Sequence, residues 1–445
     1  MSLPIDFDAK TDVGKKRKHN EDNFFVDKSI SLFAVADGMG GHAAGEVASA
    51  LAVHSFHEEL RKHDDLLGRL NEVEPEARLR LCALLSHCLE HASALIFREA
   101  GEDATKRGMG TTFSGLLLRG RYAFIVHVGD SRVYLLRGGE VQQLTEDHTV
   151  VNELLRRGKI TAEQAADFTQ KNAITRAVGV YERVEVDTLA IEVLPGDQFL
   201  LCSDGLAGYL SSVDEISTAF ESLDTTNVTT SLIALANERG GKDNITTIAI
   251  RIAAGETDAA RAKRFEKKKA LFARVPIFSS LTEREMLRII QIVTIREYEP
   301  GAVVIREGSA GDELFVVLQG ALSVHRSGQV LSELGEGQHV GEMALIRNVP
   351  RSATVESIGR SELAVIRRSD FFKLLKGDTD LTTKLLWQIV GVLADRLEQT
   401  SVELSHTKQE LLEIVQTGEV SSVTIQDGLA SFEDADTAEI EKVRS

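Results

Sequence analysis

Four aspartates occupy similar places in the sequence, at the ends of short apolar segments. Asp37 follows LFAVA, Asp130 follows AFIVHVG and Asp204 follows QFLLCS, while Asp243 opens the segment DNITTIAI. Charged side chains avoid the interior of a strand, but at a strand end the rigid sheet fixes them, and adjacent glycines admit backbone carbonyls and water. We therefore expect several of these carboxylates to cluster at one edge of a sheet.

A cluster of carboxylates favours the binding of particular cations. Close carboxylates repel one another and take up protons unless a cation balances their charge. All-oxygen ligands, with no histidine or cysteine set beside them, point to Mg²⁺ or Mn²⁺. Because a single Asp-Gly pair is a common turn signal, the prediction of a metal centre depends on the four positions together.

The segments between these residues predict an α+β fold. Residues 1–254 alternate Val, Ile, Leu and Phe runs with Gly- and Asp-containing turns and include helical stretches at 43–62 and 76–100, which favours sandwich-like sheets. A charged stretch predicts a linker helix at 255–270. Short strands separated by turns follow over 298–368 and predict a small β-roll. A chain of 445 residues also favours two domains and a tail.

Six motifs follow one another in the order of a known family. They are TDVGKKRKHNEDN, DGMGGH, GMGTT, GDSR, SDGL and GKDNIT. Across residues 8–252 this series resembles the PPM (type 2C) metal-dependent serine/threonine phosphatases, and DGMGGH is shared with many bacterial members. The resemblance implies a PPM-type β-sandwich flanked by helices, and a signalling hydrolase that attacks phosphoserine or phosphothreonine of a protein with metal-activated water. A catalytically weak phosphoprotein-binding nucleotide sensor is the alternative.

The resemblance also implies a set of metal ligands for two or three ions of Mn²⁺ or Mg²⁺. Asp37 would bridge two ions, with the backbone carbonyl of Gly38 on one of them. Asp204 and Asp243 would hold the other ion. Asp130 together with Asp204 would form the third-metal site of bacterial members.

Other positions take their roles from the same resemblance. Asp22 of NEDN would bind through metal-held water, and Arg17, three residues before Asn20, matches the phosphate-binding arginine, whose planar guanidinium suits phosphate oxygens. Met39 stands where many eukaryotic members have the histidine often assigned as general acid. The segment LTEDHTVVNELLRRGKITAEQA falls where bacterial members carry a mobile flap, and its candidate substrate contacts are His148, Arg156 and Arg157.

A second site with anion-binding character lies in the predicted roll. Gly341 and Glu342 would begin a short helix that offers backbone N–H groups to an anion, Glu342 can accept from a sugar hydroxyl, and Arg351 would neutralise a cyclic phosphate. With Ser352 following, this pattern resembles the cyclic-nucleotide-binding family over residues 271–400. The resemblance implies cAMP or cGMP as regulatory ligand, and Ser352 leaves the choice open. A roll without ligand is the alternative, which the intact Glu342 and Arg351 disfavour.

The C-terminal part of the sequence predicts a long helix and a tail. Apolar residues at 381–414 alternate at spacings of four and three, the pattern of a heptad seam. We expect a coiled-coil extension at 401–415 and a parallel homodimer. Residues 416–445 are polar and acidic, so we expect a disordered tail. This tail has no helix-turn-helix, which argues against a transcription regulator of the catabolite-activator type.

The composition of the chain limits the classes of binding partner and the cellular compartment that we expect. A net charge of −17 argues against a nucleic-acid partner. The cysteines, Cys82, Cys88 and Cys202, have no metal-type spacing and leave one unpaired, which suits a reducing compartment. Because the N-terminus lacks a signal-peptide pattern and no apolar run is long enough to span a bilayer, we expect a cytoplasmic protein without a membrane partner.

Overall fold

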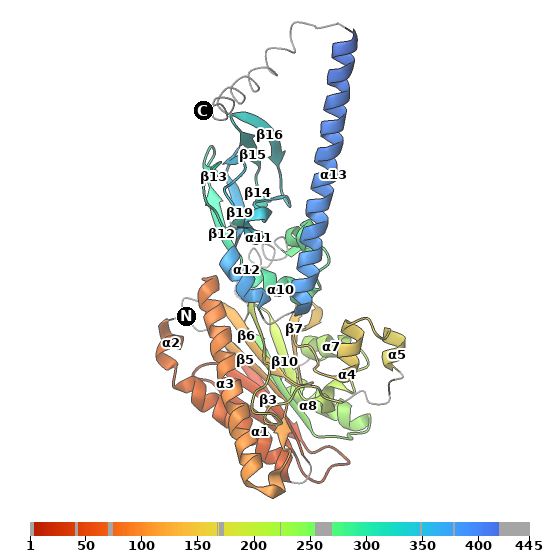
Figure 1. The fold of residues 1–445 in the computed structure, drawn as a ribbon. Helices are drawn as coiled ribbons and strands as arrows, with labels where there is room; N and C mark the ends of the chain where they lie inside the picture. The colour runs from red at the N-terminus through yellow and green to blue at the C-terminus, as the bar shows by residue number, and fades with distance from the viewer. Residues whose placement is uncertain are drawn as a thin grey trace. The chain divides into compact units, whose positions relative to one another are not determined.

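The fold is described from a computed structural model (Figure 1), which defines residues 4–40, 43–69, 74–166, 168, 173–222, 224–253, 269–347, 349–376 and 379–417. By internal contacts, residues 1–275 and 281–379 belong to one compact unit, and residues 276–280 and 380–445 to a second. Most of the predicted linker helix at 255–270 and of the predicted disordered tail at 416–445 lies outside the described residues.

The first part of the chain contains two antiparallel sheets. One has the strand order β1-β11-β10-β7-β8 and the other the order β2-β3-β5-β6-β9, with β4 paired to β3. The strands of the first sheet are β1 (Ile5–Asp12), β7 (Arg132–Arg137), β8 (Glu140–Gln143), β10 (Gln198–Cys202) and β11 (Ile245–Ile252). Those of the second are β2 (Asp22–Asp27), β3 (Leu32–Met39), β4 (Gly110–Thr111), β5 (Phe113–Arg119), β6 (Tyr122–Val128) and β9 (Asp187–Glu192).

Helices flank these sheets and complete two apolar cores. The larger core joins the second sheet to α1 and α3, and the other joins the first sheet to α7 and α8. Pro75 begins α3, where its missing N–H is not needed, and the side chain of Asp224 caps α8 by accepting from Asn227 N. The helices are α1 (Ala43–Arg61), α2 (Asp64–Arg69), α3 (Pro75–Glu102), α4 (Val150–Arg156), α5 (Ala162–Ala166), α6 (Asp204–Ala207), α7 (Asp214–Ser222) and α8 (Thr225–Glu238).

Helix α3 is the one described helix whose length and hydropathy would allow it to cross a membrane. Half of its most apolar window is buried inside the fold. Its buried residues include Leu85, Cys88 and Leu89 of the larger core, so α3 is accounted for as a core helix.

The later part of the chain folds into a β-roll of two four-stranded sheets. Helix α10 (Glu283–Gln291) precedes the roll, and short helices α11 (Glu342–Ile346) and α12 (Arg368–Leu375) interrupt and follow it. One sheet contains β12 (Thr294–Tyr298), β19 (Ser361–Arg367), β14 (Glu313–Gln319) and β17 (His339–Val340). The other contains β13 (Val303–Ile305), β18 (Thr354–Ser357), β15 (Leu322–Arg326) and β16 (Gln329–Leu334).

The second unit is dominated by the long helix α13 (Thr379–Thr417). The predicted architecture is therefore confirmed: an α+β sandwich flanked by helices, followed by a β-roll and a long C-terminal helix. Along α13 the seam residues Leu386, Val390, Leu397, Leu404 and Leu411 are exposed.

Candidate active site

The strand ends place the predicted aspartates close together. Asp22 opens β2 and pairs across the sheet with Asp37, near the end of β3. Asp130 follows the end of β6, Asp204 follows the end of β10, and Asp243 precedes the start of β11. The charge of each of Asp22, Asp130 and Asp204 affects the ionisation of Asp37. The structure thus brings the acids together, but from strand ends of both sheets rather than from one edge of a single sheet.

Burial and mutual repulsion hold protons on this cluster. Burial raises the pKa of Asp22 to about 7 and that of Asp130 to about 7, and in both cases the neighbouring charge of Asp204 raises it further. Burial, followed by repulsion from Asp22, Asp204 and Asp130, raises the pKa of Asp37 well above its usual range. Such a cluster is stable only when protons or cations balance its charge.

The donor set fits a hard divalent cation. Oδ1 of Asp22 and Oδ1 of Asp204 are buried without a hydrogen-bond partner, and the charge of Asp204 is among those that raise the pKa of Asp37. A cation among these carboxylates would satisfy the two oxygens and balance the charge. Among the described residues, no group of three or more His, Cys, Asp or Glu side chains meets the geometry of a metal site by itself, so the individual ligand assignments stay predictions.

Three polar residues that the sequence alone does not single out hold the acidic cluster in place. Ser203 Oγ donates to Asp22 Oδ2 at 2.7 Å, and Thr112 Oγ1 accepts from Asp37 N at 2.9 Å. Asn244 ties β11 to the Arg17 loop, since its Nδ2 donates to His19 O at 2.9 Å. Each lies within or beside one of the recognised motifs, SDGL, GMGTT and GKDNIT, which was the available signal.

Gly38 lies where the backbone is too crowded for a side chain. Its N–H donates to Glu21 O at 3.1 Å, and a Cβ at this position would collide with the carbonyl oxygen of Gly45. The position therefore requires glycine. This packing fixes the backbone directly after Asp37, where the predicted carbonyl ligand lies.

Arg17 reaches the edge of the acidic cluster. Its Nη2 donates to Asp243 Oδ2 at 2.7 Å, and the two side chains are 50% and 37% exposed. The hydrogen bond to Asp243 raises the pKa of Arg17 despite its partial burial. The guanidinium therefore lies at the entrance of the site, where it can contact solvent-borne phosphate, although part of its donor capacity is used by Asp243.

The raised pKa values predict that the protein without divalent ions loses stability as pH rises. An unfolded aspartate titrates near 3.9, whereas Asp22 and Asp130 in the fold titrate at about 7. Between these values the folded chain holds more protons, so the free energy of unfolding falls as pH increases. We expect the Tm in chelator to fall between about pH 4 and about pH 7, and Mn²⁺ to restore it at the higher pH. A Tm that Mn²⁺ leaves unchanged at the higher pH would contradict the metal centre.

The predicted nucleotide residues also come together. Arg351 Nη2 donates to Glu313 O at 2.8 Å, and a Cβ on either Gly311 or Gly341 would collide with its guanidinium. Gly341 is the N-cap of α11 and adopts a left-handed φ of 90°, which favours glycine. Burial lowers the pKa of Arg351, while nearby acids including Glu313 oppose the shift. The arginine is thus held beside the N-terminus of α11.

Two of the predicted nucleotide-binding residues differ in their exposure to solvent. Glu342, the first residue of α11, is buried, whereas Ser352 is exposed. The structure therefore brings Gly341, Glu342 and Arg351 into one cradle and leaves Ser352 at its surface. The roles of these four residues toward a nucleotide stay predictions.

A buried cluster of acids at strand ends suits hydrolysis by metal-activated water, and comparisons with known proteins agree. The family described as "Protein phosphatase 2C" matches residues 14–238, and the one described as "Cyclic nucleotide-binding domain" matches residues 295–378. This chain therefore belongs to the protein phosphatase 2C family of serine/threonine phosphatases, and it carries a cyclic nucleotide-binding domain.

Individual relatives cover the phosphatase part. Protein phosphatase PhpP of Streptococcus pneumoniae is 38% identical over 239 residues, which are 53% of this chain and 93% of the relative. Serine/threonine phosphatase stp of Listeria monocytogenes is 38% identical over 246 residues, 54% of this chain and 93% of the relative. Among solved structures, the Mycobacterium tuberculosis serine/threonine phosphatase PstP/Ppp is 36% identical with a TM-score of 0.48, covering 56% of this chain and 99% of that one.

Proposed function

We propose that this chain hydrolyses phosphoserine and phosphothreonine in proteins with Mn²⁺ or Mg²⁺, and that cAMP or cGMP bound to the roll regulates the rate. The observation that carries the catalytic part is the buried acidic cluster, whose pKa values are raised by burial and mutual repulsion. A catalytically weak phosphoprotein-binding sensor would have no need for such a cluster. The free, buried cysteines suit a reducing compartment, and we place the protein in the cytoplasm.

Each residue of the site has a part in the proposed mechanism. Asp37 would lie between two ions, with the carbonyl of Gly38 on one of them and Asp204 and Asp243 on the other. Asp130 would join Asp204 at a third ion. Bound ions supply an activated water and neutralise charge that develops on the phosphoryl oxygens.

Two residues near the rim would complete the site. Asp22, fixed by Ser203, would orient the solvent around the ions. Arg17 would exchange part of its contact with Asp243 for bidentate contact with the phosphate oxygens. The exposure of Arg17 supports this role, because the substrate arrives from solvent as part of a protein.

Met39 predicts a dependence on the leaving group. It is half-buried at the end of β3, pairs with Gly110 and cannot donate a proton. We expect slower hydrolysis of alkyl phosphates, such as a phosphothreonine peptide, than of p-nitrophenyl phosphate, whose leaving group needs little protonation. Met39→His should raise the ratio of the alkyl to the aryl rate. An unchanged ratio in steady-state assays would contradict this account.

The roll would bind the nucleotide through the cradle around Arg351. Arg351 and the backbone N–H groups at Gly341 and Glu342 would take the cyclic phosphate, and the Glu342 carboxylate would accept from the ribose hydroxyl. Ser352, at the surface of the cradle, would add a further polar contact. The test of the whole proposal is hydrolysis of a phosphothreonine peptide with Mn²⁺, measured without nucleotide, with cAMP and with cGMP. No hydrolysis with either metal would overturn the catalytic part.

We further propose a homodimer formed through α13. Leu397 and Leu404 are 73% and 70% exposed on the helix, although both belong to its apolar seam. The double variant Leu397→Glu/Leu404→Glu should sediment as a monomer at micromolar concentration, whereas the native chain and Ser401→Glu, which lies off the seam, should sediment as dimers. A native chain that sediments as a monomer would refute the dimer.

A further inference from the structure

In the sequence, helix α10 lies between the segments that match the two families, and it is hydrogen-bonded to β9 of the phosphatase domain. It falls after residue 238 and before residue 295, the limits of the two matches. Its cap at Ile292 is followed almost directly by β12 of the roll. Thr282 and Glu285 form a capping box at its start, and Leu287 and Ile289 on its apolar face are buried. Because so few residues separate α10 from β12, any displacement of the roll would also displace this helix.

The C-terminal end of α10 is fastened to β9 and α3. Gln291 Oε1 accepts from Ala190 N of β9 at 3.0 Å, and Gln291 O accepts from Arg78 Nε of α3 at 2.8 Å. Arg78 is buried and also donates to the hydroxyl of Tyr122 at 3.0 Å. A cation at this position satisfies a terminal carbonyl and complements the helix dipole. This end of α10 is therefore anchored.

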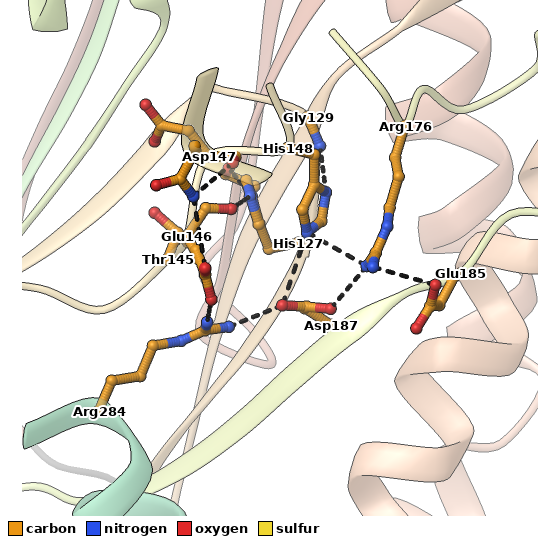
Figure 2. Close-up of polar contacts among 12 residues, drawn as sticks. His127, Gly129, Thr145, Glu146, Asp147, His148, Arg176, Glu185, Asp187 and Arg284 are labelled. Carbon is orange, nitrogen blue, oxygen red and sulfur yellow. Dashed lines mark hydrogen bonds and ion pairs between the residues drawn. The ribbon is translucent and has the colours of Figure 1, made fainter. Parts of the chain in front are cut away.

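The N-terminal end of α10 contacts two acids of the phosphatase domain through Arg284 (Figure 2). Arg284 Nη1 donates to Glu146 Oε2 at 2.5 Å, and Nη2 donates to Asp187 Oδ2 at 2.7 Å. Arg176 Nη1 also donates to Asp187, at 3.1 Å. Burial alone would raise the pKa of Asp187, but the neighbouring His148 ring and the charge of Arg284 bring it well below its usual range.

The tripeptide Glu146, Asp147 and His148 connects this contact to the loop that carries Asp130. His148 N donates to Gly129 O at 2.8 Å, and its ring Nδ1 accepts from Gly129 N at 3.0 Å. The Nε2 of His148 faces Asp187 at 3.6 Å (Figure 2). His148 is 6% exposed. The prediction that it contacts substrate is therefore wrong, because its ring is used inside the fold.

Asp147 holds the other side of the same loop. Its carboxylate accepts from Arg132 Nε at 2.9 Å and from Arg132 Nη2 at 2.6 Å, and its carbonyl accepts from Asn152 of α4 at 2.8 Å. Gly129 and Arg132, which flank Asp130, are thus both fixed by residues adjacent to the Glu146 contact. The same residues belong to the predicted flap segment and lead into α4.

We propose that α10 transmits the state of the nucleotide roll to the phosphatase site, with Arg284 as the positioning residue. Through Asp187 and His148 it sets the backbone beside Asp130, and through Glu146 it sets the base of the flap segment. The inference rests on the proposed function, since it names the route of that regulation. Nucleotide binding acts by changing the relative stability of arrangements with and without these ion pairs. Couplings between sites commonly change affinity by about 5- to 150-fold.

The test uses the full chain and three variants. Arg284→Ala removes both ion pairs, Arg284→Lys keeps the charge without the planar fork, and Glu283→Gln serves as control, because Glu283 is 59% exposed on the same helix and pairs with Lys269 at 2.6 Å. For each chain we would measure kcat and the apparent KM for Mn²⁺ with p-nitrophenyl phosphate, with and without cAMP or cGMP, and nucleotide affinity by calorimetry.

We expect cAMP or cGMP to change the rate or the Mn²⁺ KM of the native chain by about 5-fold or more. Arg284→Ala should bind the same nucleotide with unchanged affinity, shift the Mn²⁺ KM more than kcat, and lose most of the nucleotide response. Arg284→Lys should recover part of it, and Glu283→Gln should behave as the native chain.

Three results would overturn the inference in distinguishable ways. A native nucleotide response in Arg284→Ala would exclude this route and leave the phosphatase intact. A native chain that hydrolyses phosphate and binds nucleotide without any response would exclude coupling. A native chain inactive with Mn²⁺ would overturn the proposed function itself. If Arg284→Ala does not fold, amide hydrogen exchange of the native chain decides: unchanged exchange over residues 146–158 on nucleotide binding would overturn the inference.

Discussion

Asp37→Asn is expected to lower the rate of phosphopeptide hydrolysis by about 100-fold or more, the scale for removing one preorganised electrostatic contact, while the chain stays folded. Asparagine keeps the size of the side chain but removes the charge that would bridge two ions. Asp204→Asn should have a comparable effect, because the charge of Asp204 acts on Asp37 and its Oδ1 is buried without a hydrogen-bond partner. The measurement is the steady-state rate with Mn²⁺ in excess.

Asp37→Asn should also stabilise the protein in the presence of a chelator. Asp37 is half-buried and repelled by its neighbours, so loss of its charge relieves part of the cost of deprotonation at high pH. Asp27→Asn is the matched control, since Asp27 lies at the other end of β2. Its pKa is lowered to about 2, because hydrogen bonds from Ser29 and His57 outweigh its burial.

Relative to the native chain, the two substitutions should therefore change the stability of the metal-free protein in opposite directions. A carboxylate with a depressed pKa stabilises the fold above its unfolded pKa, and this stability is lost as pH falls toward about 2. Asp27→Asn should thus be less stable at neutral pH but fully active. Asp37→Asn should lose activity by the factor given above and, without metal, should be more stable. A rate in Asp37→Asn close to that of the native chain would contradict the bridging assignment.

Arg351→Ala is expected to weaken binding of cAMP or cGMP by about 100-fold, in keeping with the loss of a charge-assisted, partly buried contact to phosphate. Its guanidinium is held between Gly311 and Gly341 and is already oriented by Glu313 O. Calorimetry with each nucleotide measures the loss. Arg360→Ala is the control, because Arg360 is 71% exposed and pairs with Glu297 on the surface of the same roll.

Activity assays separate regulation from localisation. In the native chain the bound nucleotide should alter phosphopeptide hydrolysis, and this response should disappear in Arg351→Ala while basal hydrolysis persists. Tight binding with an unchanged rate at all Mn²⁺ concentrations would favour a roll that only localises the enzyme. Undiminished affinity in Arg351→Ala would contradict the assigned phosphate contact.

The acidic cluster could be predicted from the sequence because each member lies at a local signal. Asp37, Asp130 and Asp204 each follow an apolar run and adjoin a glycine, and strand ends of this kind meet at sheet edges. The cradle around Arg351 was predictable for the same reason, since Gly341, Glu342 and Arg351 fall within one short motif. Local patterns therefore indicated which residues lie together in each domain.

The contacts of α10 had no such signal. Arg284 and Asp187 lie 97 positions apart, and each is an ordinary charged residue in its own segment. The sequence placed α10 within a predicted nucleotide domain at 271–400, whereas Gln291 and Arg284 bond it to β9 of the phosphatase sandwich. The position of His148 in the flap segment predicts a substrate contact, and only the fold reveals its bond to Gly129.

Helix α10 also protects an edge. Among the strands that the structure describes, β9 is the last of its sheet, so the backbone groups on its outer side pair with no further described strand. Gln291 takes one of these groups, Ala190 N, into a side-chain hydrogen bond, and α10 packs along the strand. Unprotected edge strands recruit strands from other chains. A phosphatase domain cut before α10 would therefore expose β9 as a template for intermolecular strand pairing, and the helix that we infer to carry the signal also covers this strand.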